Sequence, residues 1–175
     1  LPYTRNKPKC LVEIHGKTLL ERQLQIIDSL KIEKKIIFVG GYKYNLLPKK
    51  YDKLFVNNNF ATTNMLSSLF CAIKELKGNV IISYGDIVYS KKMLVKLIKQ
   101  KENIVVPIDI NWEKYWKKRF KNPLDDAETL NIDKDGYLRE IGQKPSSFKE
   151  IDGQYLGLIK LNRNGCEIFS FNYNL

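Results

Sequence analysis

An aspartate that directly follows an apolar run is the first candidate for chemistry in this sequence. The run 80–83 has the β-branched pattern of a buried strand, Gly85 opens a turn, and Asp86 comes next. In open α/β sheets, ligands bind outside the carboxyl ends of the strands, so Asp86 is expected at a ligand-binding edge. Carboxylate oxygens are the ligands that Mg²⁺ prefers, which makes Asp86 a candidate metal ligand. A turn aspartate that caps the following helix is the alternative.

Two glycines end another predicted strand. The run 35–39 is followed by Gly40 and Gly41, and then by Tyr42. Glycines at a strand end allow the backbone to approach a ligand closely. The alternative interpretation is a plain tight turn, which also favours glycine. Gly41 and Tyr42 are therefore candidates for ligand contact.

The third candidate is an acidic turn. Asp125, Asp126 and Glu128 lie within four residues of one another, and such carboxylates repel unless a cation or lysines neutralise them. One interpretation is recognition of a metal or an amine. The other is an exposed turn that offsets the basic stretch 117–121.

The elements that must position these residues alternate between strand and helix. Helical spacing of apolar residues predicts helices over 19–30, 66–76 and 91–100, and apolar runs predict strands at 35–39, 54–56, 80–83, 104–106 and 155–161. Asp135-Gly136 predicts a hairpin turn. This order indicates one α/β domain over 1–175, a three-layer αβα sandwich with a mostly parallel mixed sheet. The segments 57–63 and 111–126 are expected to be long irregular loops, where binding residues collect.

Composition restricts the classes of function. The formal net charge is +11, which favours polyanionic ligands or else reflects lysines on solvated helix faces. Aromatic and basic residues do not alternate as in a nucleic-acid groove, so no nucleic-acid partner is expected. Three widely spaced cysteines indicate free thiols in a reducing cytoplasm, and a single histidine argues against histidine-based metal sites. Apolar runs are too short for a membrane span, and no signal peptide is recognisable.

Several stretches together resemble a known enzyme family. They are residues 8–11, 16–20, 63–69, 83–89, 119–120, 122–124, 126–129 and 153–158. The opening stretches resemble the nucleotidyltransferase superfamily that includes sugar-1-phosphate nucleotidylyltransferases and choline-phosphate cytidylyltransferases. The later ones look like a bacterial subgroup, the cytidylyltransferases for phosphonates and for phosphoglutamine in capsule synthesis.

The resemblance implies a fold, a reaction and partners. The fold is Rossmann-like, of the nucleotidyltransferase or glycosyltransferase A-like type. The reaction transfers CMP from CTP to a phosphorylated or phosphonylated small molecule, with Mg²⁺ as cofactor and pyrophosphate as product. The alternatives are sugar-1-phosphate nucleotidyl transfer and a non-catalytic nucleotide-binding domain. A homodimer is compatible with the resemblance.

The resemblance also implies roles for individual residues. Lys9 matches the lysine that contacts the substrate phosphates, and Asp86 matches the Mg²⁺ aspartate. The remaining expected contacts to nucleotide or substrate are Gly41, Tyr42, Asn64, Ser68, Tyr84, Asp126, Glu128 and Tyr155. A glycine-rich phosphate loop before Leu1 and a late metal-binding aspartate after Leu175 belong to the same expectation.

Overall fold

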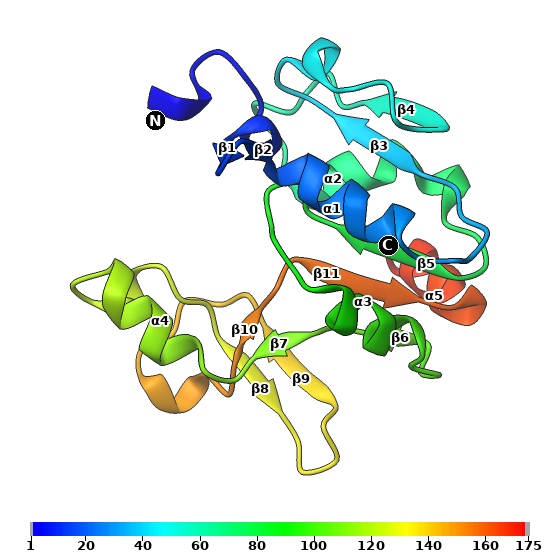
Figure 1. Cartoon of the computed structure of the whole chain (residues 1–175). Helices are drawn as coiled ribbons and strands as arrows, with labels where there is room; N and C mark the ends of the chain where they lie inside the picture. Colours follow the sequence, from blue (N-terminus) through cyan, green and yellow to red (C-terminus); the bar gives the residue numbers. More distant parts are fainter. Residues whose placement is uncertain (1, 174–175) are drawn as a thin grey trace. The chain divides into compact units, whose positions relative to one another are not determined.

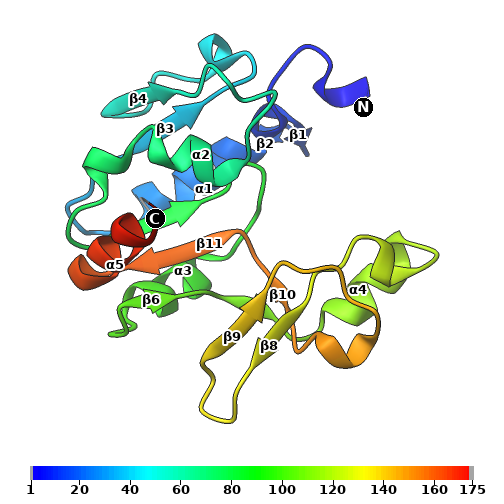
Figure 2. The same cartoon turned by 180° about the vertical axis from the view of Figure 1, so that it is seen from behind.

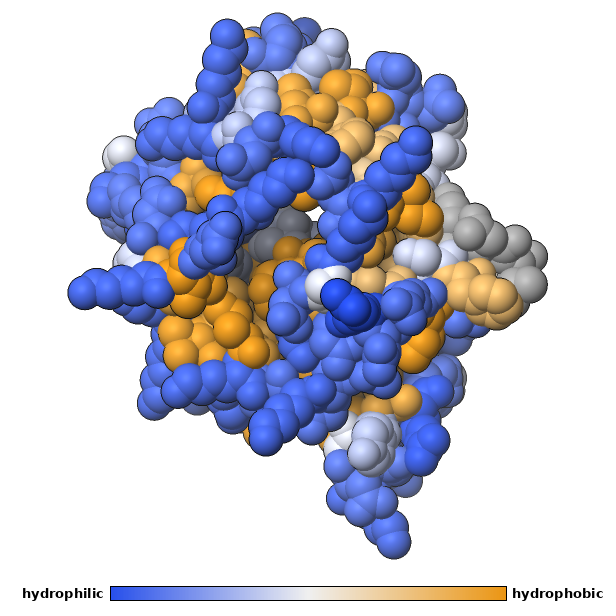
Figure 3. Space-filling view, turned by 90° about the vertical axis from the view of Figure 1, so that its right-hand side faces the viewer, coloured by the Kyte–Doolittle hydropathy of each residue, from blue (hydrophilic) through white to orange (hydrophobic). Residues whose placement is uncertain are grey.

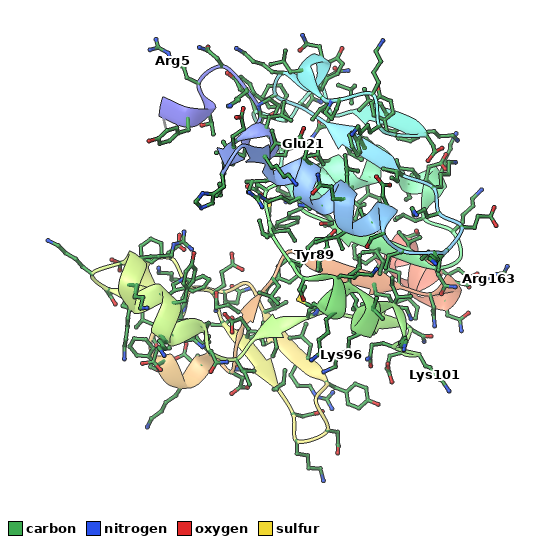
Figure 4. The ribbon with its side chains drawn as sticks, viewed as in Figure 1. Arg5, Glu21, Tyr89, Lys96, Lys101 and Arg163 are labelled. Carbon is green, nitrogen blue, oxygen red and sulfur yellow. The ribbon has the colours of Figure 1, made fainter. Side chains whose placement is uncertain are left out.

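In the computed structural model, which describes residues 2–173, helix α1 (Leu19–Asp28) begins at a capping box. The Thr18 hydroxyl accepts a hydrogen bond from the Glu21 amide at 3.0 Å, and the Glu21 carboxylate accepts one from the Thr18 amide at 2.8 Å. Glu21 lies at the start of the helix (Figure 4). Leu20 and Leu24 are buried on one face. The predicted helix is confirmed, and it ends two residues before Leu30.

The chain divides into two compact units. The first contains the residues up to 105 together with those from 160 onward, and the second contains 106–159. The single domain expected from the sequence stays a prediction, and each unit is described by itself.

The first unit contains the parallel strands. β3 (Ile37–Gly40) pairs in parallel with β4 (Lys53–Val56), and Ile37 lies opposite Lys53. A second sheet has the order β5 (Val80–Ser83), β11 (Leu158–Leu161) and β6 (Ile104–Val105), in which β6 and β11 are antiparallel. β1 (Glu13–Ile14) and β2 (Lys17–Thr18) form a short antiparallel hairpin.

Helices cover both faces of these strands. α1 and α3 (Lys91–Ile98) lie on one face, and α2 (Met65–Phe70) and α5 (Arg163–Tyr173) lie on the other (Figures 1 and 2). The rings of Phe70 in α2 and Phe169 in α5 stack with centroids 5.8 Å apart. The first unit thus has the three layers that the alternating sequence pattern predicts.

The second unit is built from antiparallel strands and one helix. β7 (Ile108–Asp109) pairs with β10 (Gln154–Tyr155), and β8 (Leu130–Ile132) forms a hairpin with β9 (Leu138–Ile141). Gly136 has φ +84° in the hairpin turn, as predicted for Asp135-Gly136.

The remaining helical segments are short 3₁₀ turns. They are Pro2–Thr4, Lys9–Leu11, Tyr44–Leu46, Ile73–Glu75, Pro123–Asp125 and Phe148–Glu150. Within residues 2–173, every helix falls short of the length and apolar character that crossing a bilayer requires.

One predicted loop is wrong. Residues 111–126 contain helix α4 (Trp112–Arg119) and a 3₁₀ turn. Trp112 and Trp116 are one helical turn apart. Trp112 forms a buried cluster with Ala127 and Ile151, and Trp116 packs against that cluster. The helix was hard to read from the sequence because charged residues, several of them basic, occupy most of its other positions.

The strand pairing also differs from the prediction of a mostly parallel sheet. Among the described residues, β3 and β4 are parallel, whereas the pairs β1–β2, β6–β11, β7–β10 and β8–β9 are antiparallel. The mixed character is confirmed. The predicted late strand is divided into β10 and β11 because Gly157 between them adopts φ +77°, a left-handed conformation that interrupts an extended chain.

A cavity of about 590 Å³ lies in the first unit. Its walls combine aliphatic and aromatic side chains of the strands and of the helices on one face, among them Leu20, Leu24, Phe38, Ile81, Leu94 and Ile98. The surface in Figure 3 is hollowed, and apolar side chains gather around the hollow. The side chains of these helices and strands therefore do not fill all of the space between them in the described part of the chain.

An ion-pair cluster connects three segments of the first unit. Glu75 accepts hydrogen bonds from Lys35, at 2.8 Å, and from Lys53 at the start of β4. The Lys35 hydrogen bond, followed by that of Lys53, lowers the pKa of Glu75 to about 2 from its usual 4.5. Because this pKa is depressed in the folded chain, the interaction stabilises the fold above about pH 4.5 and is lost as the pH falls through about 2.

We therefore expect Glu75→Gln to lower the melting temperature at pH 7, with a difference from the unmodified protein that shrinks between about pH 4.5 and pH 2. Thermal unfolding followed by circular dichroism over this pH range measures the effect. Glu33→Gln, at an exposed position, is the control. An equal difference at pH 2 and pH 7 would contradict the assignment.

Candidate functional site

The loop after β5 presents Asp86 to solvent. Asp86 is exposed, and within the described residues its carboxylate makes no hydrogen bond and no ion pair. The alternative interpretation, a helix cap, is not what the structure has, since the Ser90 hydroxyl caps α3 by accepting from the Met93 amide at 3.1 Å. The carboxylate is therefore available to a ligand from outside the chain.

The segment that carries Lys9 touches the loop that carries Asp86. A Cβ placed on Gly85 would lie 3.1 Å from the Cβ of Cys10, so the glycine lets the two backbones approach closely. Burial raises the pKa of the Cys10 thiol, and the negative charge of Asp86 raises it further. Lys9 is exposed beside Cys10. The structure thus brings together the neighbourhoods of the two predicted catalytic residues, whose roles stay predictions.

A buried glutamine holds the same loop. The Gln23 side chain of α1 donates to the carbonyl oxygens of Tyr84 and Ile87, each at 2.9 Å, and the Ser83 hydroxyl lies 3.0 Å from its Oε1. Ser83 is also hydrogen-bonded to Tyr89. Burial raises the pKa of the Tyr89 hydroxyl, and its bond to Ser83 partly offsets that increase. Tyr89 is labelled in Figure 4.

Gly41 and Tyr42 lie in the turn after β3. A Cβ on Gly41 would lie 2.6 Å from the Cβ of Phe60, and the rings of Tyr42 and Phe60 meet edge to face at 6.1 Å. The Tyr42 hydroxyl donates to the carbonyl oxygen of Arg5. The close approach that Gly41 permits is therefore to Phe60 of the chain itself, and contacts of Gly41 and Tyr42 with a ligand stay predictions.

Ser68 is joined to the loop 57–63 through one buried side chain, and Asn64 begins the same helix. Asn57, which is 5% exposed, donates to the hydroxyls of Thr63 and Ser68, each at 2.9 Å. Asn64 caps α2 by accepting from the Ser67 amide at 3.0 Å. Asn57 thus fixes the loop against the helix that carries two predicted substrate contacts.

We expect Asn57→Ala to reduce the free energy of unfolding by about 1 kcal/mol, because the variant loses the hydrogen bonds that the buried Asn57 amide donates to the Thr63 and Ser68 hydroxyls. Urea unfolding followed by fluorescence measures this loss. Asn58→Ala, at the adjacent exposed position, is the matched control and should change it by less than about 0.5 kcal/mol. Equal losses for the two variants would contradict the anchoring role.

Three predicted contacts lie in the second unit. Asp126 and Glu128 are exposed, and Tyr155 is half-buried in β10. The buried Gln154 side chain donates to the Glu128 carbonyl oxygen at 2.7 Å, which fixes the acidic turn beside β10. Asn122 donates to the Asp125 carboxylate at 2.9 Å.

The described residues hold no group of three or more His, Cys, Asp or Glu side chains that could bind a metal. The acidic turn at 125–128 is therefore not a preformed metal cage. A single exposed carboxylate such as Asp86 does fit Mg²⁺, because this ion keeps several waters and commonly binds through one or two carboxylates together with substrate phosphates.

Sequence reasoning missed Gln23 and Asn57. Gln23 lies three residues after Leu20 and four before Ile27, so it shares the apolar face of its helix, and a polar residue there signals a buried hydrogen-bonding role. Asn57 carries no comparable signal, because it begins a run of three asparagines in which only tertiary contacts distinguish the first.

Comparison with solved structures identifies the class of fold. The inositol-1-phosphate CTP transferase of T. maritima matches with a TM-score of 0.69 and 13% identity, over 99% of this chain and 68% of that one. The CTP:phosphocholine cytidylyltransferase of Streptococcus pneumoniae matches with a TM-score of 0.56 and 19% identity, over 97% of this chain and 68% of that one. The chain therefore has the Rossmann-like fold of nucleotidyltransferases.

Comparison of sequences identifies the family. The model of the MobA-like NTP transferase domain matches residues 4–137. The CTP:phosphoglutamine cytidylyltransferase of Campylobacter jejuni is 40% identical over 173 residues, 93% of this chain and 68% of the relative. The choline-phosphate cytidylyltransferase of Streptococcus pneumoniae is 32% identical over 91 residues, 50% of this chain and 40% of the relative. This chain belongs to the MobA-like NTP transferase family, as the resemblance in its sequence predicts.

Proposed function

We propose that this chain is the main part of a cytidylyltransferase, which transfers CMP from CTP to a phosphorylated small molecule and releases pyrophosphate. The observation that carries the proposal is the contact between Cys10, next to Lys9, and Gly85, next to Asp86, because it joins the two segments that carry a cation and an exposed carboxylate. The two cytidylyltransferases that match in sequence support cytidine as the base.

The reaction that we propose requires charge stabilisation more than proton transfer. An acceptor phosphate has a second pKa of about 6, so it is largely anionic at pH 7 and can attack the α-phosphorus without a side-chain base. The difficulty is to bring two anions together and to stabilise the charge that spreads over the transferring group. A chain with a single histidine and a net charge of +11 suits this chemistry.

Lys9 and Asp86 would then have different tasks. The Lys9 ammonium would neutralise substrate phosphate directly and orient it for attack in line with the leaving pyrophosphate. The Asp86 carboxylate would hold Mg²⁺, which when bound neutralises phosphate charge. Cys10 and Gly85 would keep the two segments in contact.

The acceptor is proposed to bear a phosphate or phosphonate group, with phosphoglutamine as the leading example because the Campylobacter jejuni relative is named for it. Asp126, Glu128 and Tyr155 would contact the acceptor. We propose a cytoplasmic location, which suits the free thiols of Cys10, Cys71 and Cys166.

Lys9→Ala and Asp86→Asn are each expected to lower the rate of pyrophosphate release from CTP by a factor of about 100 or more in the full-length protein. The melting temperature should change little, since both side chains are exposed. Lys77→Ala and Asp28→Asn, which are also exposed, should keep the normal rate. Normal release by either site variant would remove that residue from the mechanism.

A second assay tests the substrates. We expect CTP to exceed UTP, dTTP, ATP and GTP in pyrophosphate release, with phosphoglutamine, aminoethylphosphonate or choline phosphate as acceptor and only when Mg²⁺ is present. Faster release with a sugar 1-phosphate and another nucleotide would instead favour a sugar nucleotidylyltransferase. Undiminished release after treatment with EDTA would contradict the role of Mg²⁺.

A further inference from the structure

The Gln23 side chain directs both of its amide hydrogens to the loop after β5. Gln23 is 4% exposed. Its Nε2 donates to the carbonyl oxygens of Tyr84 and Ile87, and its Oε1 lies within hydrogen-bonding distance of the Ser83 hydroxyl. The two carbonyl groups enclose Gly85 and Asp86, so one amide nitrogen closes the loop around the carboxylate that we assign to Mg²⁺.

The loop requires such a restraint. It lies outside β5 and α3, and Gly85 has no side chain to restrict its backbone. α1 is a rigid support, because a capping box fixes its start and the buried Leu20 and Leu24 hold it against the rest of the unit. Hydrogen bonds from a side chain on such a helix therefore restrict the motion of the loop.

We propose that Gln23 is a positioning residue, which holds the Asp86 loop in the geometry that binds metal and substrate phosphate. This inference rests on the proposed function. Glutamine is suited to the task because its neutral amide supplies both hydrogens to the two carbonyl oxygens. A glutamate would turn an acceptor oxygen towards them, and an apolar side chain would supply neither hydrogen bond.

Gln23→Met in the full-length protein tests the proposal, because methionine keeps the length of the side chain and removes its donors. Gln25→Met is the matched control. Gln25 has the same residue type on the same helix, but it is exposed, and its Oε1 accepts only from the exposed Lys17 at 3.2 Å.

Two measurements apply to both variants. Hydrogen exchange of the amides at 84–88, followed by mass spectrometry, should become about tenfold faster in Gln23→Met, whereas exchange in α3 stays unchanged. The Mg²⁺ concentration that gives half the maximal rate of pyrophosphate release should rise about tenfold. Gln25→Met should match the unmodified protein in both.

Unchanged exchange at 84–88 in Gln23→Met would overturn the proposal. Exchange that accelerates equally in the loop and in α3 would also overturn it, because it would show that Gln23 only stabilises the core. The proposed function fails by a different observation, normal pyrophosphate release by Asp86→Asn, which leaves the exchange measurement unaffected.

Discussion

The buried amide of Gln23 must satisfy its hydrogen-bonding groups inside the protein, and its partners lie at the end of β5. A glutamine that loses contact with water is costly unless donors and acceptors meet it. The carbonyl oxygens of Tyr84 and Ile87 do so, together with the Ser83 hydroxyl. The path of the loop, and hence the place of Asp86, depends on this interaction between a helix and a strand end.

A second constraint is the close approach of the backbones at Gly85 and Cys10. Only a residue without a Cβ fits easily at that separation, so the 3₁₀ turn that begins at Lys9 and the loop after β5 come into contact. A cation and a carboxylate on adjoining segments suit the roles proposed for Lys9 and Asp86, towards substrate phosphate and Mg²⁺. That reasoning agrees with membership of a family of NTP transferases.

Similar anchors recur away from the predicted catalytic residues. Asn57 joins the loop 57–63 to α2, and Gln154 joins the acidic turn to β10. Both are buried polar side chains that hold irregular backbone. Irregular segments lack the ladders of a helix or sheet, so their positions depend on side-chain hydrogen bonds of this kind.

The sequence by itself determined the layers, the main helices and strands, and the family. These follow from local patterns: the apolar spacing of residues such as Leu20 and Leu24, and the β-branched runs. It also placed Asp86 after a strand, because strand ends can be read locally. It missed α4, whose two tryptophans pack on a core that forms only when Ala127 and Ile151 come together.

The tertiary structure alone decided which residues meet. Gln23 and Tyr84 are 61 positions apart in the chain, and Asn57 is distinguished from the asparagines beside it only by its burial. The close approach of Gly41 to the side chain of Phe60 joins residues 19 positions apart and is recorded in no local pattern. Local patterns specify local conformation, whereas close contacts between distant segments depend on how the elements pack, which neither spacing nor composition records.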